Sequence, residues 1–95
     1  MGELTKDQAV GVVRDYFRKV EVAAIEVAAG GLKVGDILRI KGHTTDLVQR
    51  IDSMQVNHQE VVEAGPGDLV GIKVSDRVRE QDLVFIEGGR DEEVL

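Results

Sequence analysis

The chain has 95 residues, 42% of them hydrophobic, which is a length and composition typical of one globular domain. It contains no cysteine, and this excludes a disulfide scaffold, a thiolate zinc site and a cysteine nucleophile. Its net charge of −6 disfavours a nucleic-acid partner, because a phosphate backbone would be repelled. The sequence has no run of about 18 apolar residues, and residues 1–8 lack the apolar segment of a signal peptide. We therefore expect a cytoplasmic protein that makes no membrane contact.

The N-terminal part of the chain is compatible with two structures. Residues 1–8 are polar, and we expect them to be frayed. In residues 9–20 the larger apolar side chains fall near helical spacing: Val10, Val13, Phe17 and Val20. The β-branched and aromatic residues at 12–13 and 16–17, together with Gly11, favour a strand instead. Periodicity alone leaves both structures open.

Apolar residues alternate with glutamates in residues 20–27, which predicts a strand with Val22 and Ile25 in the core. The phase of this alternation shifts by one residue across Ala23 and Ala24. Such a shift predicts a β-bulge at these two alanines. The Gly-Gly pair that follows predicts a turn.

The next predicted strand covers residues 37–41. Leu38 and Ile40 are expected to face the core, and Arg39 and Lys41 to face solvent. Together with a lysine of a later strand, Lys73, these cations form at most a modest basic face. A solvated face is favoured here over an RNA footprint.

A second ambiguous stretch covers residues 47–56. Its apolar residues fit an amphipathic helix about as well as a bulged strand: Leu47, Val48, Ile51 and Met54. The turn at 65–68 contains a proline between two glycines, and it leads into a strand in which Val70 and Ile72 alternate with outward positions.

A charged connection at 75–82 precedes a short strand at 83–86 that is apolar on both faces. Residues 88–95 form an acidic tail that we expect to be flexible.

Short strands separated by turns predict an all-β fold, and we expect a small closed β-barrel of six to seven strands over residues 9–87. Closure is favoured because it removes the exposed edges of so small a sheet. The residues expected in the core are Val22, Ile25, Leu38, Ile40, Ile51, Val70, Ile72 and Val84.

The residues that could take part in catalysis or metal binding form no recognised motif. His43 and His58 lack the spacing of a metal or catalytic motif, and Asp36 and Asp68 stand beside glycines, where an aspartate usually bonds its own turn. No Gly-x-Ser-x-Gly nucleophile motif and no phosphate-binding loop are present. We expect no catalytic residue, no metal site and no cofactor.

The polar loop after Gly42 is the segment most suited to a contact. Its residues are His43, Thr44, Thr45 and Asp46. They suit either a turn stabilised by side-chain hydrogen bonds or a docking loop, and the structural role is favoured.

The two Gly-Asp turns, with the strands that follow them in segments 32–42 and 64–72, resemble the second domain of translational GTPases. That domain is the β-barrel of elongation factor Tu and initiation factor two, and the resemblance covers residues 10–86. The loop at 43–46 and the Ser-Met-Gln segment at 53–55 resemble small free-standing elongation-factor-like proteins. The resemblance implies strands in both ambiguous stretches, and translation as the context.

In elongation factor Tu this barrel holds the aminoacylated end of tRNA with a Glu, an Arg and an Asn. The resemblance places Gln55, His58 and Leu69 at these positions, and none of the three matches. With the acidic charge, this disfavours tRNA or the ribosome as a partner, and another protein is expected instead. The absence of a phosphate-binding loop implies that GTPase activity is absent.

We therefore expect a non-catalytic binding or adaptor module. The residues expected to bind its partner are His43, Thr44, Thr45, Asp46, Gln55 and His58. The alternative is an accessory β-barrel subunit of a separate enzyme, because barrels of this type also resemble the C-terminal domain of the U32 peptidase family. A stand-alone enzyme is less favoured than either.

Overall fold

The computed structural model describes residues 8–87, which form ten β-strands. In chain order these are β1 (Gly11–Phe17), β2 (Val22–Val27), β3 (Leu32–Lys33), β4 (Ile37–Lys41), β5 (Asp46–Arg50), β6 (Met54–Val56), β7 (Gln59–Val61), β8 (Glu63–Ala64), β9 (Leu69–Lys73) and β10 (Leu83–Ile86). The frayed segment predicted at 1–8, apart from Gln8, and the tail predicted at 88–95 lie outside the described residues.

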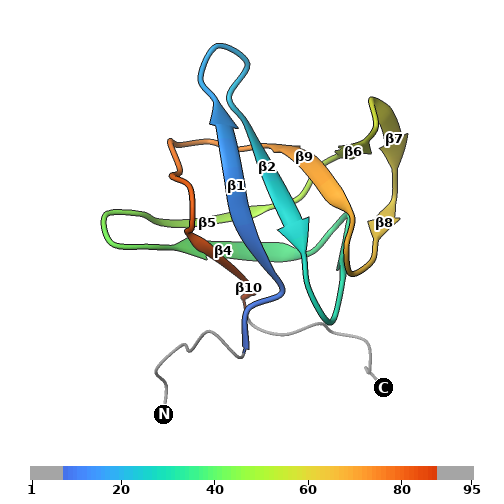
Figure 1. Cartoon of the computed structure of the whole chain (residues 1–95), viewed down its shortest axis with the longest axis horizontal. Coiled ribbons are helices and arrows are strands. Elements are labelled where there is room, and N and C mark those ends of the chain that lie inside the picture. Colours follow the sequence, from blue (N-terminus) through green and yellow to red (C-terminus); the bar gives the residue numbers. More distant parts are fainter. Residues whose placement is uncertain (1–7, 88–95) are drawn as a thin grey trace.

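Eight strands form one antiparallel sheet in the order β5-β4-β10-β1-β2-β9-β6-β7, and β3 pairs with β8 in a second, two-stranded sheet. The large sheet curls round so that its inner face encloses the core (Figure 1). The all-β prediction is confirmed. The closed barrel of six to seven strands is wrong, because the sheet has eight strands and its edge strands β5 and β7 do not pair within residues 8–87.

The first ambiguous stretch, residues 9–20, contains strand β1 and forms no α-helix. This strand pairs with β2 on one side and with β10 on the other. Gly11 is buried where a Cβ atom would lie only 2.9 Å from the Glu26 carbonyl oxygen and 2.9 Å from the side chain of Ile25. Glycine therefore allows the close approach of β2 at this point.

The β-bulge lies in β1 and not in β2. The register between the two strands shifts between Val13 and Asp15, so Arg14 is the extra residue. The Arg14 side chain forms an ion pair with Glu26, with 2.7 Å between Nε and Oε1. The pairing of β2 with β9 is uninterrupted, so the bulge predicted at Ala23 and Ala24 is wrong.

The alternation of buried residues along β2 shows why it contains no bulge. Ala23, Ile25 and Val27 face the core without a break. Val22 lies on the outer face opposite Phe17 and is only half-buried, so its predicted place in the core is wrong. A small alanine occupies the core position and a valine the outer one, which reverses the pattern that hydrophobicity alone suggests.

The stretch 47–56 also forms strands, and the helical alternative is wrong. It contains most of β5 and all of β6, separated by an irregular segment at 51–53. The predicted orientation of β4 is confirmed: Leu38 and Ile40 are fully buried, while Lys41 is exposed.

Three turns of the same design each precede a strand of the large sheet. In the first, the Lys33 N–H donates to Asp36 Oδ2 over 3.0 Å, and the Asp36 N–H donates to the Lys33 carbonyl over 3.1 Å. Gly65 and Asp68 repeat this pair of bonds at 2.9 and 3.1 Å. The turn roles predicted for Asp36 and Asp68 are therefore confirmed.

The third turn joins Arg79 to Asp82 with the same two bonds, at 2.9 and 3.1 Å. In each turn the third residue has a positive φ, which is 99° at Gly35, 93° at Gly67 and 77° at Gln81. Glycine tolerates this conformation readily, whereas glutamine does not. Because the third turn lacks a glycine, the sequence pattern did not reveal it.

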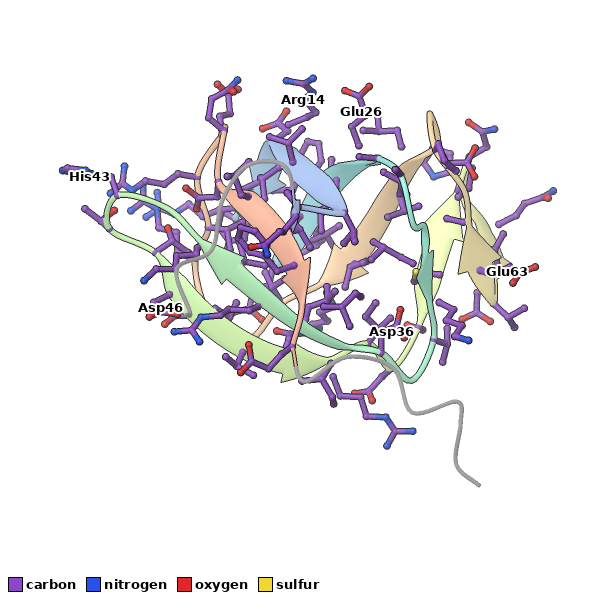
Figure 2. All side chains as sticks on the ribbon, turned by 90° about the horizontal axis from the view of Figure 1, so that it is seen from below. Arg14, Glu26, Asp36, His43, Asp46 and Glu63 are labelled. Carbon is purple, nitrogen blue, oxygen red and sulfur yellow. The ribbon has the colours of Figure 1, made fainter. Side chains whose placement is uncertain are left out.

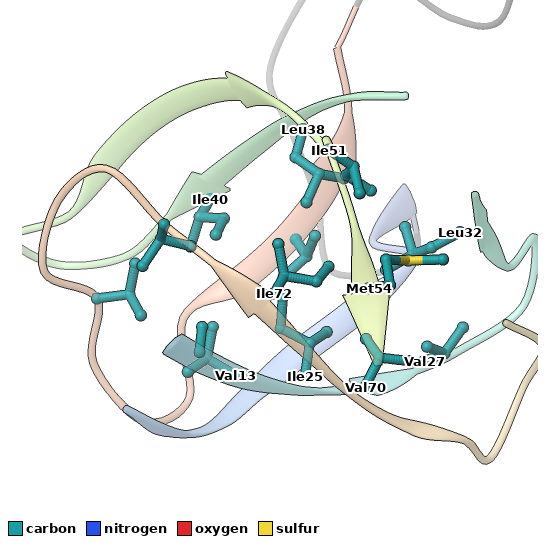
Figure 3. Close-up of a cluster of buried hydrophobic side chains, with 14 of the residues drawn as sticks. Val13, Ile25, Val27, Leu32, Leu38, Ile40, Ile51, Met54, Val70 and Ile72 are labelled. Atoms are coloured by element: carbon teal, nitrogen blue, oxygen red, sulfur yellow. The ribbon is translucent and has the colours of Figure 1, made fainter. Parts of the chain in front are cut away.

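The core is aliphatic and lies inside the curled sheet (Figure 3). All the predicted core residues except Val22 are confirmed as buried. The core cluster consists of Val13, Ala23, Ile25, Val27, Leu32, Leu38, Ile40, Ile51, Met54, Ala64, Val70, Ile72, Val74, Val78 and Val84.

The side-chain amide of Gln49 bridges β5 and the end of β9. Its Nε2 donates to the Lys73 carbonyl over 2.9 Å, and its Oε1 accepts from the Ser75 N–H over 2.7 Å. One side chain thus supplies a donor and an acceptor to two backbone groups at the end of β9, as a neighbouring strand would, and so links β5 to a strand with which it does not pair.

Truncation of a central core residue should cost a large part of the stability. We expect Ile72→Ala to lower the free energy of unfolding by roughly 2–5 kcal/mol, because it leaves a cavity in an aliphatic core. Urea denaturation followed by circular dichroism measures this. Val48→Ala, at a half-exposed position, is the control and should change stability by less than about 0.5 kcal/mol. Equal effects of the two changes would contradict the placement of the core.

The Gln49 bridge should protect the Ser75 amide from hydrogen exchange. Gln49→Leu keeps the approximate size of the side chain but removes both hydrogen bonds, so we expect faster Ser75 exchange and a loss of about 1–3 kcal/mol. Hydrogen exchange measured by NMR reports the first effect, and urea denaturation the second. Gln55→Leu is the matched control, because Gln55 makes no side-chain hydrogen bond within residues 8–87. Unchanged Ser75 exchange in Gln49→Leu would refute the bridge.

Candidate partner-binding surface

The predicted contact loop forms the tip of the β4–β5 hairpin. The Gly42 N–H donates to the Thr45 carbonyl over 2.8 Å, which closes the loop. His43 and Thr44 are exposed, and Figure 2 shows His43 at the far end of the hairpin. Thr45 is only 7% exposed, so its role is structural and it offers little surface to a partner.

Asp46 is held by two cations of the neighbouring strand. Arg39 donates to both carboxylate oxygens at 3.0 Å, and Lys41 Nζ lies 3.4 Å from Oδ2. The hydrogen bond from Arg39 is the main cause of a lowered Asp46 pKa, and Lys41 adds to it. The Arg39 pKa is raised, first by the same hydrogen bond and more weakly by Glu87, 3.6 Å away. These ion pairs neutralise most of the predicted basic face.

The base of this hairpin packs against a buried carboxylate. Asp82, which is 5% exposed, lies so close to the Gly42 Cα atom that any Cβ at that position would collide with its side chain. The same carboxylate accepts the Arg79 N–H of the third turn. Because it has no Cβ, Gly42 allows the β4–β5 loop to pack directly against Asp82 at the start of β10.

The β6–β7 hairpin carries the other predicted contact residues. Asn57 and His58 have φ values of 53° and 66°, as a two-residue turn of type I′ requires. His58 is therefore a turn residue, and its side chain is exposed. Gln55 is exposed on β6, opposite Glu60.

The structure does not bring the predicted contact residues together. His43, Thr44 and Asp46 belong to the β4–β5 hairpin, and Gln55 and His58 to the β6–β7 hairpin on the other side of the molecule (Figure 1). Their role in binding a partner stays a prediction, now divided between two surfaces.

The described part of the chain contains no group of three or more His, Asp or Glu side chains that could hold a metal ion. The two histidines lie on separate hairpins. The buried carboxylates of Asp36 and Asp82 are engaged by backbone N–H groups in their turns. None of these groups lies in an arrangement suited to general acid–base or nucleophilic catalysis.

An open groove of about 450 Å³ lies beside the Gln49 bridge. Its lining residues come from three separate parts of the chain and are mostly polar: Glu21, Gln49, Arg50, Asp52, Ser53, Lys73, Val74 and Ser75. The groove could not be predicted from sequence, because it depends on the approach of β5 to residues 24 positions further along.

No helix within residues 8–87 is long and apolar enough to cross a membrane.

No family model matches the chain. A curated relative, an uncharacterized protease of Methanocaldococcus jannaschii, is 42% identical over 78 residues, which are 81% of this chain and 19% of the relative. A collagenase of Porphyromonas gingivalis is 30% identical over 92 residues, or 96% of this chain and 26% of the relative. The chain thus spans about a fifth to a quarter of the length of these relatives.

A solved structure, the C-terminal domain of a candidate U32 peptidase of Geobacillus thermoleovorans, superposes with a TM-score of 0.81. The match covers 92% of this chain and all of that domain, at 19% identity. At this identity the likeness establishes the fold, which this chain shares with that C-terminal domain.

These matches correct the family relationship that we expected from the sequence. The resemblance to the second domain of elongation factor Tu and initiation factor two is wrong, because the relatives found are proteases and the matching fold is that of a U32-type C-terminal domain. The role expected from it, an adaptor in translation, is wrong for the same reason. Because the chain is similar to segments of proteases, an association with an enzyme is better supported than we expected from its sequence.

The ion pairs of Asp46 should make the stability of the hairpin depend on pH. Its folded-state pKa lies below the ordinary value of 3.8, so its contribution is present above that value and is lost as the pH falls through the folded pKa. We expect Asp46→Asn to be less stable than the wild type near neutral pH, and the difference to shrink as the pH falls below 3.8 and through the lowered pKa of Asp46.

Urea midpoints at a series of pH values measure this dependence, and added salt should reduce the neutral-pH difference. Asp52→Asn removes an exposed carboxylate that has no ion pair within the described residues. It should produce no comparable difference. A pH-independent effect of Asp46→Asn would refute the assignment.

Proposed function

We propose that this chain is a non-catalytic accessory module of a U32-type protease, which acts together with a catalytic unit. The observation that carries the proposal is the 42% identity to a protease over 81% of this chain, although the chain spans only 19% of that protease. The U32-type C-terminal domain has the same fold over its whole length, which supports the same assignment.

The arrangement of side chains supports an accessory role. The exposed histidines lie on different hairpins, and the buried aspartates hold turns together. By contrast, the fold presents two protruding hairpins and an open groove, which suit contacts with another polypeptide. The cytoplasmic location and the protein partner expected from the sequence remain part of this proposal.

A reconstitution experiment tests the proposal. The chain is mixed with a purified U32-type catalytic polypeptide from the same organism, and binding is measured by calorimetry. Cleavage of denatured collagen and of unfolded proteins is measured with and without the chain. We expect no cleavage by the chain alone, binding to the catalytic polypeptide, and a change in its rate of cleavage when the chain is added.

Paired variants locate the contact. The double change His43→Ala and Thr44→Ala alters the β4–β5 hairpin, and Gln55→Ala with His58→Ala alters the β6–β7 hairpin. If one hairpin carries the contact, one pair should weaken binding by about tenfold or more, and the other pair serves as its control. Cleavage by the purified chain alone, or no binding to the catalytic polypeptide, would overturn the proposal.

A further inference from the structure

Strand β5 is an edge of the large sheet, and half of its backbone groups point away from the molecule's own ladder. Hydrogen bonds join Gly42 to Thr45 and Ile51 to Asp36, each at 2.8 Å, at the two ends of the β4–β5 pairing. In an antiparallel pair, hydrogen-bonded and non-hydrogen-bonded positions alternate. The N–H and C=O groups at positions 46, 48 and 50 therefore point to the open edge. Of these, the Arg50 carbonyl also accepts a long hydrogen bond of 3.4 Å from Gln49 Nε2, which leaves its second lone pair available.

Apart from its two charged residues, Asp46 and Arg50, this edge has none of the usual features that prevent pairing with another strand. β5 has five residues, no proline and an uninterrupted register with β4. Val48, at its centre, is 49% exposed. The opposite edge strand, β7, has only three residues and begins directly after the tight turn at Asn57 and His58.

The sequence of β5 is complementary to itself in the antiparallel direction. When two copies pair about a twofold axis at Val48, the two Val48 residues face one another, and Asp46 of each copy faces Arg50 of the other. All three outward-pointing residues then form hydrogen-bonded pairs across the axis. We propose that this chain forms a homodimer in which two β5 strands pair antiparallel and join the two sheets edge to edge.

The charges favour this arrangement over its alternatives. Arg50 is exposed and has no ion pair within residues 8–87, so it is available to a second copy. Asp46 already accepts bonds from Arg39 and Lys41, and a carboxylate has about four acceptor sites, so it can also accept from Arg50 of the other copy. A parallel in-register pairing would instead place Asp46 opposite Asp46, and like charges in direct opposition are destabilising.

In the same register, the tip of the β4–β5 hairpin of each copy lies near the other copy. Asp52 and Ser53 lie just beyond the C-terminal end of β5, the end toward which the hairpin tip of the other copy projects, and these two residues line the groove beside Gln49. The groove therefore offers room for the tip that projects beyond the paired strands.

The expected dimer is weak. Pairing through one five-residue strand and a hairpin tip buries less surface than the roughly 1,200–2,000 Å² of a standard stable interface. The dimer should therefore form in the micromolar range or above and depend on concentration. It does not depend on the proposed link to a protease.

Sedimentation velocity over a wide range of concentrations tests the dimer. We expect the wild type to move from monomer to dimer as its concentration rises, and Val48→Lys to weaken the dimer by about tenfold or more, because two lysines would meet at the axis. Val62→Lys is the matched control: Val62 is 74% exposed but lies outside β5, so this change should leave the dimer intact. Circular dichroism confirms that each variant is folded.

Charge reversal tests the pairing partner. Arg50→Asp and Asp46→Lys should each weaken self-association, since each places like charges opposite one another. An equimolar mixture of the two variants should form a heterodimer in which every facing pair is complementary. If Asp46→Lys does not fold, Arg50→Asp and Val48→Lys still decide the matter. A wild type that remains monomeric up to millimolar concentration, or a dimer unaffected by Val48→Lys, would overturn the proposal.

Discussion

Three aspartates set the points at which β4, β9 and β10 begin. Each carboxylate accepts the N–H of the residue three positions earlier at 2.9–3.0 Å, and each aspartate directly precedes its strand. This constraint is local, so it can form before the long-range pairing of the strands. The rest of the structure depends on it, because β10 pairs with β4 and β1, and β9 pairs with β2. At Asp82 the same interaction also fixes the β4–β5 hairpin, since Gly42 packs against that carboxylate.

The parts of the fold that could be predicted are those that local chemistry determines. Turns with glycine at the positive-φ position and strands such as β4, with apolar residues at alternate positions, are visible in the sequence. Where a residue departs from its usual preference, prediction failed: Gln81 adopts a positive φ, and Ala23 fills a core position while Val22 faces outward. The Gln49 bridge and the groove beside it could not be predicted either, because both arise from contacts between distant parts of the chain.

The same distinction explains why the turns suggested the wrong relatives. A Gly-Asp turn followed by an aliphatic strand suits any small antiparallel sheet whose chain must reverse and enter a core, so it reports the fold and not the function. The residues that could separate one family from another lie on the surface, for example Gln55 and His58. Neither side chain makes a hydrogen bond or ion pair with another residue in the range 8–87, so apart from the positive φ of His58 the fold places little constraint on their identity. Of the contact residues predicted from the loop, Thr45 is buried and Asp46 is bound by Arg39, while His43 and Thr44 are exposed, and their role in binding stays a prediction.

The β4–β5 hairpin combines a rigid base with an open edge. The ion pairs of Asp46 and the contact of Gly42 with Asp82 hold the hairpin in one conformation. Gln49 bonds two backbone groups of the neighbouring segment, at Lys73 and Ser75, and of the outward groups of β5 only the Arg50 carbonyl, over 3.4 Å. A fully closed barrel would have paired these groups and left no edge. Within residues 8–87 the fold instead leaves one side of β5 without a paired strand, and preorganisation of that strand lowers the entropic cost of adding a further one. The proposed pairing of two copies thus depends on the incomplete closure of the sheet.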